Sequence, residues 1–589
     1  MAAKYSVGID LGTTNSVLAC VELGREDASP EVVPIPQLTA PSTVEPRAML
    51  PSFLYLGSPE EAEKGVFKLP WGEPPYAVGE WARRQAADAP MRTVAGAKSW
   101  LTYGRVDRRQ PILPWNAPEE VAKVSPVEAS RRILEHLLAA WAGAHPEAPI
   151  GKQQVVLTVP ASFDAVAREL TREAALQAGL PENFVLLEEP QAAFYAWLAD
   201  QSKSWRKLVK QGDVVAICDV GGGTIDLTLI SVTQEEGELV LQRLAVGNHI
   251  LVGGDNMDLA LAQLAQTRFA EKGVELDAWQ SVALWHACRI AKETLLAPDG
   301  PVKCPVTVLG RGRRLVGGTV SVELTRDEVV AALTDGFFPP GPLDARPARR
   351  AVSGFRELGL PFEADPAITR HLAHFLKQQT NVRPTRLLFN GGVFKSEFFQ
   401  RRVLEAVAGW YEVGASSLEL AHNQDFDLAV ARGAAYYGRA KREGGIRIRG
   451  GASRSYYVGI ETAGPAIPGV VRPLRQLCVV PRGLEEGSEI DIPGDTIGLI
   501  TGEAAEFRFF SSLSRKDPPG GVVTKWTEEE IQETSPLVAT LPAAADGEND
   551  YVPVRFHVRL TELGVLELWC VSTVSKDRWK LEFSVREEG

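Results

Sequence analysis

Two short glycine-rich turns, each preceded by an aspartate at the end of an apolar run, carry the clearest chemical signal in this sequence. The first follows Asp10 and includes Gly12, and the second follows Asp219 and spans residues 221–223. A strand that turns through glycine and threonine presents backbone N–H groups and hydroxyls to an anion at close range, which suits a polyphosphate. A carboxylate is tolerated beside phosphates only when a cation lies between them. Asp10 and Asp219 therefore predict Mg²⁺, held through water molecules as this ion prefers.

Two further glycine pairs strengthen this signal, one at Gly253 and Gly254 and the other at Gly391 and Gly392. A single turn of this kind has the pattern of an ordinary glycine hairpin and would not identify a ligand site. Four such segments in one chain favour a nucleotide-binding clamp. The clamp is not a Walker A loop, because the sequence has no GxxxxGK motif followed by serine or threonine.

The elements that position these turns repeat one another. Residues 5–22 and 214–232 each have the pattern of an apolar strand, a polar turn and a second apolar strand. Strand patterns at 154–160, 184–187 and 386–389 alternate with helical patterns at 163–179, 279–296 and 427–442. This duplication predicts an α/β fold of two related lobes that face one cleft. The Pro-rich stretch 28–51 is predicted to be a surface excursion.

The composition changes after the last predicted helix of the second lobe. Residues 443–453 are rich in glycine and arginine, which is typical of a linker. Short strand patterns separated by turn residues then follow to the end of the sequence, without a long helical pattern. We therefore predict a nucleotide-binding domain at 1–442, a linker at 443–453 and an all-β sandwich module at 454–589.

The order of motifs resembles the DnaK-type, seventy-kilodalton heat-shock chaperone family. GIDLGTTNS (8–16) and DVGGGTIDLTLI (219–230) are similar to the two phosphate motifs of the family. LTVPASFDAVARELTREAALQAGL (157–180) and LLEEPQAAFYAWL (186–198) resemble its connecting segments, and ACRIAKETLL (287–296) and LLFNGGVFKS (387–396) its adenosine site. The resemblance covers residues 5–440 and continues more loosely into the β module at YVGIETAGPAIPGVVRPL (457–474). It implies an actin-like ATPase domain followed by a peptide-binding β domain.

The resemblance also implies the roles of individual residues. Lys98 matches the catalytic lysine that contacts the γ-phosphate and the attacking water, Glu189 the carboxylate beside the magnesium waters, and Asp219 and Thr224 the residues around the γ-phosphate. Phosphoryl transfer needs mainly positioning and charge neutralisation, so this set with Mg²⁺ at Asp10 and Asp219 is sufficient. ATP or ADP is expected to bind Gly12, Thr13, Thr14, Asn15, Gly221, Gly222, Gly223, Thr224, Gly253, Gly254, Arg289, Lys292, Gly391, Gly392 and Lys395.

Two prolines and one further acid complete the expectations for this region. Pro160 and Pro190 match the coupled proline switch of the family. Glu188, next to the catalytic glutamate, is interpreted as a solvated acidic corner.

The adenosine site departs from the family pattern. The family has an acid first and an arginine four residues later on the helix that contacts adenosine, whereas this chain has Arg289 first and Glu293 later. Their spacing allows the two side chains to pair. Lys395 stands where the family has a stacking arginine, and lysine cannot stack as a planar guanidinium does. Adenine contact is therefore expected to be weaker or differently arranged, while Lys292 matches the ribose-contacting lysine.

Two further departures concern the β module. The family linker is apolar and acidic, whereas residues 444–451 here read GGIRIRGG. This leaves open whether the linker docks on the ATPase domain, and whether a J-domain co-chaperone or a nucleotide exchange factor acts on the chain. The sequence ends at Gly589 directly after a strand pattern at 579–585, so the helical lid of the family is not expected.

The net charge and the positions of the cysteines argue against several classes of protein. The 589 residues include 75 acidic and 63 basic side chains, for a net charge of −12. An acidic balance argues against non-specific binding of nucleic acid or of membranes, because both need a basic surface. No apolar run reaches the ~18 residues of a membrane span, and the first residues have no apolar signal core, so a cytoplasmic protein is expected. The six cysteines form no CxxC pair and are interpreted as reduced, mostly buried thiols.

Three functions fit these observations. The leading hypothesis is an ATP-hydrolysing, chaperone-like protein whose lidless β module binds extended polypeptide. The second is a nucleotide-gated scaffold that binds one specific protein partner, with slow or vestigial ATPase activity. The third is a small-molecule kinase of the same actin-like superfamily, which fits the phosphate turns but leaves the β module unexplained.

Overall fold

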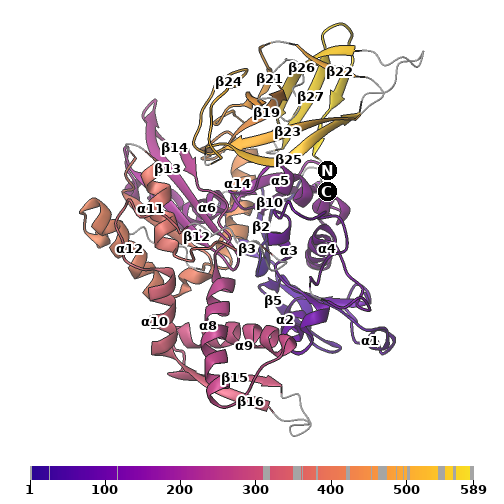
Figure 1. The fold of residues 1–589 in the computed structure, drawn as a ribbon, viewed down its shortest axis with the longest axis vertical. Helices are drawn as coiled ribbons and strands as arrows, with labels where there is room; N and C mark the ends of the chain where they lie inside the picture. Colours follow the sequence, from indigo (N-terminus) through magenta and orange to yellow (C-terminus); the bar gives the residue numbers. More distant parts are fainter. Residues whose placement is uncertain are drawn as a thin grey trace, which may run out of the picture.

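The computed structural model combines a mixed α/β region with a C-terminal group of strands (Figure 1). It describes residues 3–583, except 26, 116, 310–318, 349–359, 361, 380–381, 419–424, 453, 462–473, 486, 495, 501–503, 529, 541–550 and 562–564. The predicted α/β class of the first 440 residues is confirmed. Parts of the predicted β module, including residues 462–473 and 584–589, lie outside the described residues.

The first sheet, named here the N-terminal sheet, has the strand order β11-β10-β1-β2-β3. Its strands are β1 (Tyr5–Leu11), β2 (Asn15–Glu22), β3 (Glu31–Val32), β10 (Gln154–Val159) and β11 (Val185–Glu188), and β6 (Leu50–Pro51) also pairs with β2. Strands β1 and β2 form an antiparallel hairpin, and β10 is parallel to β1. Both faces of β1 are buried, which explains its continuous apolar run.

The second sheet, named here the central sheet, has the strand order β17-β12-β13-β14-β18. Its strands are β12 (Val214–Val220), β13 (Ile225–Glu235), β14 (Glu238–Val246), β17 (Arg386–Asn390) and β18 (Ile448–Arg449). Strands β12 and β13 form an antiparallel hairpin, and β17 is parallel to β12. Both predicted strand–turn–strand segments are therefore hairpins with a parallel neighbour, and Asp10 and Asp219 lie near the end of the first strand in each.

Helices cover the two sheets. They include α5 (Ala165–Gln177), α6 (Glu189–Gln201), α8 (Gly254–Glu271), α9 (Ala278–Leu296) and α14 (Ala429–Glu443). Small residues let α14 approach α6 very closely, since a Cβ at Gly433 would lie 1.7 Å from the carbonyl oxygen of Ala192. Ala431 and Ala435 of α14 are buried against β2. None of the described helices combines the length and apolar composition that a bilayer crossing requires.

The remaining helices and strands of the α/β region complete its layers, and α3 carries Lys98. They are α1 (Pro59–Glu63), α2 (Glu80–Asp88), α3 (Ala97–Trp100), α4 (Pro126–Ala144), α7 (Trp205–Leu208), α10 (Arg326–Phe337), α11 (Ile368–Gln378), α12 (Glu397–Tyr411), α13 (Ala415–Leu418), β7 (Leu54–Leu56), β8 (Tyr76–Val78), β9 (Thr93–Val94), β15 (Lys303–Leu309) and β16 (Thr319–Thr325). In Figure 1 the hairpin of β15 and β16 lies at the end of the molecule opposite the C-terminal strands.

The prediction of a surface excursion at residues 28–51 was wrong. This stretch contains β4 (Ile35–Ala40) paired with β5 (Thr43–Arg47), and Ile35, Leu38 and Leu50 are buried. Pro36 lies opposite Pro46 in this two-stranded sheet. Proline is tolerated in such a ribbon because each strand has a free edge, where a missing N–H breaks no ladder bond.

The C-terminal strands, named here the β module, form two sheets around one core. The first contains β19 (Ser455–Glu461), β20 (Leu474–Val480), β23 (Ala504–Ser512), β24 (Val522–Val523), β25 (Gln532–Thr540) and β29 (Glu582–Phe583), and the second β21 (Glu489–Asp491), β22 (Ile497–Ile500), β26 (Tyr551–Leu560), β27 (Leu566–Ser572) and β28 (Arg578–Lys580). Val458 and Phe509 of the first sheet share a buried cluster with Phe556 of the second. Every described helix or strand after residue 450 is a strand, as predicted.

The segment before the β module lies on the central sheet. Helix α14 ends at Glu443, and β18 then pairs in parallel with β14, Ile448 opposite Leu241. The Ile448 side chain is buried, and its backbone N–H donates to the Tyr195 hydroxyl at 2.7 Å. The sequence left docking of this segment open. In the structure this segment docks on the central sheet through the two-residue strand β18.

Replacement of Ile448 by aspartate is expected to detach this segment, because a carboxylate cannot remain in an apolar contact without a partner. The side chains of Arg447 and Arg449 are already exposed, and detachment would free the backbone around them for cleavage by trypsin. We expect cleavage after either arginine to be about tenfold faster or more than in the parent chain, since proteolysis follows local opening. N-terminal sequencing of the C-terminal fragment identifies the cut. Val574→Asp, at a side chain that is 73% exposed, is the matched control, and equal cleavage of both variants would contradict the docking.

Candidate nucleotide site

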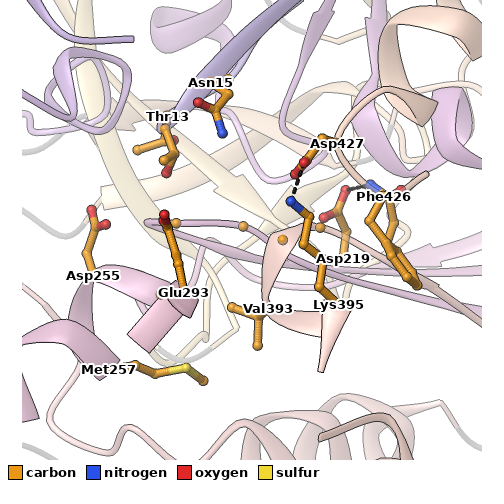
Figure 2. A pocket seen from close by; sticks show the side chains of 18 of the residues that line it. Thr13, Asn15, Asp219, Asp255, Met257, Glu293, Val393, Lys395, Phe426 and Asp427 are labelled. Atoms are coloured by element: carbon orange, nitrogen blue, oxygen red, sulfur yellow. Dashed lines mark hydrogen bonds and ion pairs between the residues drawn. The ribbon is translucent and has the colours of Figure 1, made fainter. Parts of the chain in front are cut away.

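A cavity of about 390 Å³ lies where the two hairpin turns, the start of α8 and the loop after β17 meet (Figure 2). All but three of the site residues predicted from the sequence line it. These lining residues are Asp10, Gly12, Thr13, Thr14, Asn15, Glu189, Asp219, Gly221, Gly222, Thr224, Gly254, Arg289, Lys292, Gly391, Gly392 and Lys395. The three that do not line it are Lys98, Gly223 and Gly253, each of which contacts residues that do.

The glycines allow three backbone segments to approach one another. A Cβ at Gly222 would lie 1.9 Å from the Thr14 hydroxyl oxygen, and a Cβ at Gly253 would lie 2.5 Å from the Gly222 carbonyl oxygen. The N–H groups of Gly254 and Asp255 donate to the carbonyls of Gly221 and Gly222, at 3.0 and 2.7 Å. Any larger side chain would separate the two turns and the start of α8. Gly222 and Gly253 are therefore required at these positions because no side chain fits. The two turns and the start of α8 are called the glycine cradle below.

One buried lysine, Lys98, pairs with an acid that lines this cavity. The Lys98 side chain is 5% exposed and forms an ion pair with Glu189, the first residue of α6. Burial by itself lowers the pKa of Lys98, but the charges of Glu189 and Asp10 outweigh it and raise the pKa above its ordinary value. Lys98 is thus held in its charged form among carboxylates.

Several buried carboxylates lie near Lys98, so the acids in this part of the site are more numerous than the lysine that faces them. Asp10 accepts a hydrogen bond from the Thr158 hydroxyl at 3.0 Å, and Asp219 accepts one from the Asn390 amide at 2.9 Å. Burial, followed by the charge of Glu189, raises the pKa of Asp219 well above its ordinary value and that of Asp226 to about 6. Burial and the neighbouring carboxylates both disfavour the ionised forms of these acids. Asp10, Glu189, Asp219 and Asp226 face a single lysine here.

This donor set fits a divalent cation. A bound Mg²⁺ would compensate the excess charge of Asp10 and Asp219, and oxygen is the ligand atom that it prefers. Among the described residues, no group of three or more His, Cys, Asp or Glu side chains is arranged to hold a metal ion directly. Water-mediated binding at Asp10 and Asp219 remains the prediction.

Several polar residues of the cavity were not predicted as site residues. Asp226, Asn390, Asp255, Asp258 and Asp427 all line it. Asp226 lies two residues after Thr224, whose hydroxyl contacts its carboxylate at 3.4 Å. The sequence did contain a signal for most of them, because Asp226, Asp255 and Asn390 lie within the glycine motifs themselves.

The pairing of Arg289 with Glu293 that the helical spacing allows is not formed; each residue has another partner. Arg289 is buried and forms ion pairs with Asp255 at 2.6 Å and Asp258 at 2.8 Å. Glu293 is 46% exposed and faces Arg83 of α2 at 3.4 Å. Asp258 is fully buried one turn into α8, and this makes it a stronger partner for Arg289 than an acid exposed to water.

The interpretation of Glu188 as a solvated corner was also wrong. Glu188 is 5% exposed and pairs with Arg168 of α5 at 3.0 Å and with Arg243 of β14. Burial opposes ionisation of this carboxyl, but the two guanidinium groups outweigh it and lower its pKa. Arg243 also donates to the carbonyl of Gly451 in the predicted linker. Through Arg243, Glu188 beside Glu189 is therefore connected to Gly451, which precedes the first strand of the β module.

A second contact joins the site to the β module. The Arg454 guanidinium is buried and donates to the Ser162 carbonyl at 2.8 Å. The backbone N–H of Ser162 donates in turn to Asp226 at 3.1 Å. Pro160 and Pro190 flank this region, directly after β10 and within the first turn of α6. Whether they act as a switch remains a prediction.

Comparisons with known proteins agree with this geometry. The family model described as Hsp70 protein matches residues 71–333. A Pseudomonas putida (strain KT2440) protein named chaperone protein HscA homolog is 32% identical over 311 residues, which cover 50% of this chain and 43% of that protein. A homolog of the same name from Paracidovorax citrulli is 28% identical over 415 residues, which cover 67% of this chain and 58% of that protein.

A third relative is the chaperone protein HscA of Enterobacter sp. (strain 638), which is 32% identical over 271 residues. That match covers 44% of this chain and 37% of the relative. In each of these three comparisons the matched region spans less than two thirds of the relative's length.

Proposed function

Since this chain belongs to the Hsp70 family, we propose that it binds ATP in the cavity between the two hairpins and hydrolyses it to ADP, as part of a chaperone-type cycle. The observation that carries this proposal is the charged, buried Lys98 among Asp10, Glu189, Asp219 and Asp226 beside the glycine cradle. This set of residues has the positioning and charge that phosphoryl transfer needs, and the reaction does not require any of its carboxylates to be a strong base.

We assign different steps of ATP binding and hydrolysis to different residues around the cavity. We assign the triphosphate to the backbone and hydroxyl groups of residues 12–15 and 221–224, where the two turns meet. Lys98 would neutralise charge that develops on the γ-phosphate during transfer, an effect that grows toward the transition state. Glu189, Asp219 and Asp226 would orient the attacking water and accept its proton. Mg²⁺, when bound near Asp10 and Asp219, would supply further charge neutralisation at the phosphates.

The β module would bind extended polypeptide and respond to the nucleotide. Two chains of contacts support the coupling. Glu188, beside Glu189, pairs with Arg243, which donates to the Gly451 carbonyl. Ser162 donates to Asp226 and accepts from Arg454. A change of charge at Glu189 or Asp226 on hydrolysis would act on both. We propose a polypeptide client for the β module, with a J-domain co-chaperone and an exchange factor as further candidate partners.

A second function is favoured by one observation at the other end of the cavity. Arg289 and Lys395 are both engaged by acids, so neither side chain is placed to stack on a base. Weak base contact would suit a nucleotide-gated scaffold that binds one protein partner and turns over slowly. The two functions share the site and differ in turnover.

Steady-state ATP hydrolysis with and without an unfolded peptide distinguishes them. For the chaperone function we expect turnover to increase several-fold at saturating peptide, because binding at the β module would be transmitted through Arg243 and Arg454. The full-length chain with a folded protein of similar charge, added in place of the peptide, is the control. Peptide binding without any change in turnover would select the scaffold.

A further inference from the structure

The Asp226 carboxylate is held by groups from two different sheets. Its side chain is 3% exposed and lines the nucleotide cavity. One carboxylate oxygen accepts the backbone N–H of Ser162 at 3.1 Å, and the other lies 3.4 Å from the Thr224 hydroxyl. Thr224 belongs to the hairpin turn of the central sheet, whereas Ser162 follows β10 of the N-terminal sheet. The orientation of Asp226 therefore depends on where Ser162 is held.

A histidine holds Ser162 in turn. The hydroxyl oxygen of Ser162 lies 2.8 Å from Nδ1 of His249, within hydrogen-bonding distance. The backbone fixes His249 beside the start of β13, because the N–H of Ile225 donates to the Ile250 carbonyl at 3.0 Å. The Phe163 ring, next to Ser162 in sequence, makes an edge contact with the His249 ring, with the ring centres 5.9 Å apart. Two consecutive residues that follow β10 are therefore in contact with His249.

The His249 ring is neutral near pH 7. Burial, followed by the positive charges of Arg454 and Lys98, lowers its pKa to about 4. A neutral imidazole carries one proton, and the hydrogen bonds of the ring decide which nitrogen holds it. With the proton on Nδ1, the ring N–H donates to the Ser162 hydroxyl oxygen, and the hydroxyl proton remains available to the carboxylate beyond it.

Both polar hydrogens of Ser162 act on Asp226. Burial and the charge of Glu189 raise the pKa of Asp226 to about 6, and the hydroxyl and the N–H of Ser162 oppose this rise. Hydrogen bonds in such a chain polarise and strengthen one another in a buried site. His249, Ser162 and Asp226 thus form one chain of contacts that ends at the nucleotide cavity.

The second ring nitrogen of His249 shows what this residue adds. Nε2 is covered by protein atoms and has no hydrogen-bond partner among the described residues. A buried polar atom without a partner costs folding free energy, and such an atom in a native structure calls for an explanation. Phenylalanine would fill the same space without this cost. What phenylalanine could not supply is the contact of Nδ1 with Ser162.

We propose that His249 is a positioning residue for ATP hydrolysis, which acts through Ser162 to hold Asp226 where it orients the attacking water and accepts its proton. The inference rests on the proposed hydrolytic function. Neither His249 nor Ser162 lines the nucleotide cavity. Loss of their contact should therefore lower the rate of hydrolysis and leave the affinity for nucleotide unchanged, because displacement of a positioned group acts mainly on the transition state.

The test is steady-state ATP hydrolysis by the full-length chain with His249→Phe, compared with the parent chain. We expect kcat to fall by about 10- to 100-fold and KM to stay within about twofold, since a displacement of about 1 Å can cost about 10²-fold in rate. The melting temperature should not fall, because the substitution removes the unpartnered nitrogen. Equal kcat in the two chains would overturn the inference, whereas absence of hydrolysis by the parent chain would overturn the proposed function itself.

Further variants separate positioning from a purely structural role. His249→Asn keeps a polar atom at the place of Nδ1 and should retain most of the parent rate. Ser162→Ala removes the hydroxyl and keeps the N–H bond to Asp226, and it should lose rate as His249→Phe does. The double variant should lose no more than either single one, because the two residues act in one chain. His557→Phe, on β26 of the β module, is the matched control and should hydrolyse ATP as the parent chain does.

Two results would contradict the positioning role of His249. One is an equal loss of rate in His249→Phe and His249→Asn, since the role of Nδ1 would then be excluded. The other is a fully additive loss in the double variant, since Ser162 and His249 would then act independently.

Discussion

Replacement of Lys98 by alanine is expected to lower the rate of ATP hydrolysis by about 10²- to 10³-fold, the usual consequence of removing one electrostatic stabiliser of a transition state. Affinity for ATP should change little, because the lysine would act on charge that develops during transfer and not on the bound ground state. Single-turnover hydrolysis at saturating ATP measures the first quantity, and titration with a non-hydrolysable analogue measures the second.

Controls separate this effect from damage to the fold. Lys98→Met keeps most of the side-chain volume and should lose activity to the same extent, and its melting temperature reports whether the four remaining acids destabilise the site. Lys152→Ala removes an exposed lysine and should hydrolyse ATP as the parent chain does. Unchanged turnover in Lys98→Ala would exclude Lys98 from the chemistry.

Replacement of Asp219 by asparagine is expected to weaken magnesium-dependent ATP binding by about 10- to 100-fold, the usual cost of losing a group that orients metal ligands through hydrogen bonds. Asparagine keeps the shape of the side chain and removes its charge, and the same change at Asp10 should act in the same direction. The quantity to measure is the ratio of ATP affinities with Mg²⁺ and with a chelator, which should be large in the parent chain and reduced in both variants.

Asp27→Asn, at a side chain that is 80% exposed, is the control for a simple loss of charge. If the parent chain bound ATP equally well with Mg²⁺ and with a chelator, the assignment of Asp10 and Asp219 to a metal would be wrong. Equal affinity ratios in the parent chain and in both variants would contradict it as well.

The glycine cradle was predictable because it is encoded locally. Glycine at a turn directly after an apolar strand permits backbone conformations and close approaches that other residues do not, and the residues that follow Asp10 and Asp219 are held near their strands by hairpins of a few residues. Sixteen of the nineteen predicted site residues lie around one cavity. Their roles toward a nucleotide stay a prediction.

The parts that were mispredicted or left open depend on contacts between distant segments. The carboxyl group of Glu188 is charged and buried because Arg168 and Arg243, which lie 20 and 55 residues away in sequence, converge on it. Arg289 prefers Asp258 to Glu293 because the fold buries Asp258 and exposes Glu293. Periodicity along one helix could indicate which residues were near each other on its surface. It could not indicate which of them another helix would cover.

The docked segment before the β module was also not predictable, because its position depends on contacts with distant residues. Strand β18 has only two residues, too few for any strand pattern, and the surrounding glycines and arginines are typical of a linker. Its position depends on the free edge of β14 and on a buried place for Ile448 beside Tyr195. Both belong to the tertiary structure and neither is visible in residues 443–453.

The most direct test of this account is a single-turnover measurement of phosphate release from ATP by the full-length chain, with Mg²⁺ and with Mg²⁺ removed by a chelator. We expect release with Mg²⁺ and almost none with the chelator, because Lys98 alone cannot offset the charge of four buried carboxylates and a triphosphate. Tight binding of Mg²⁺ and ATP without any phosphate release would contradict the assignment of hydrolysis to this site, and would leave a nucleotide-gated scaffold as its function.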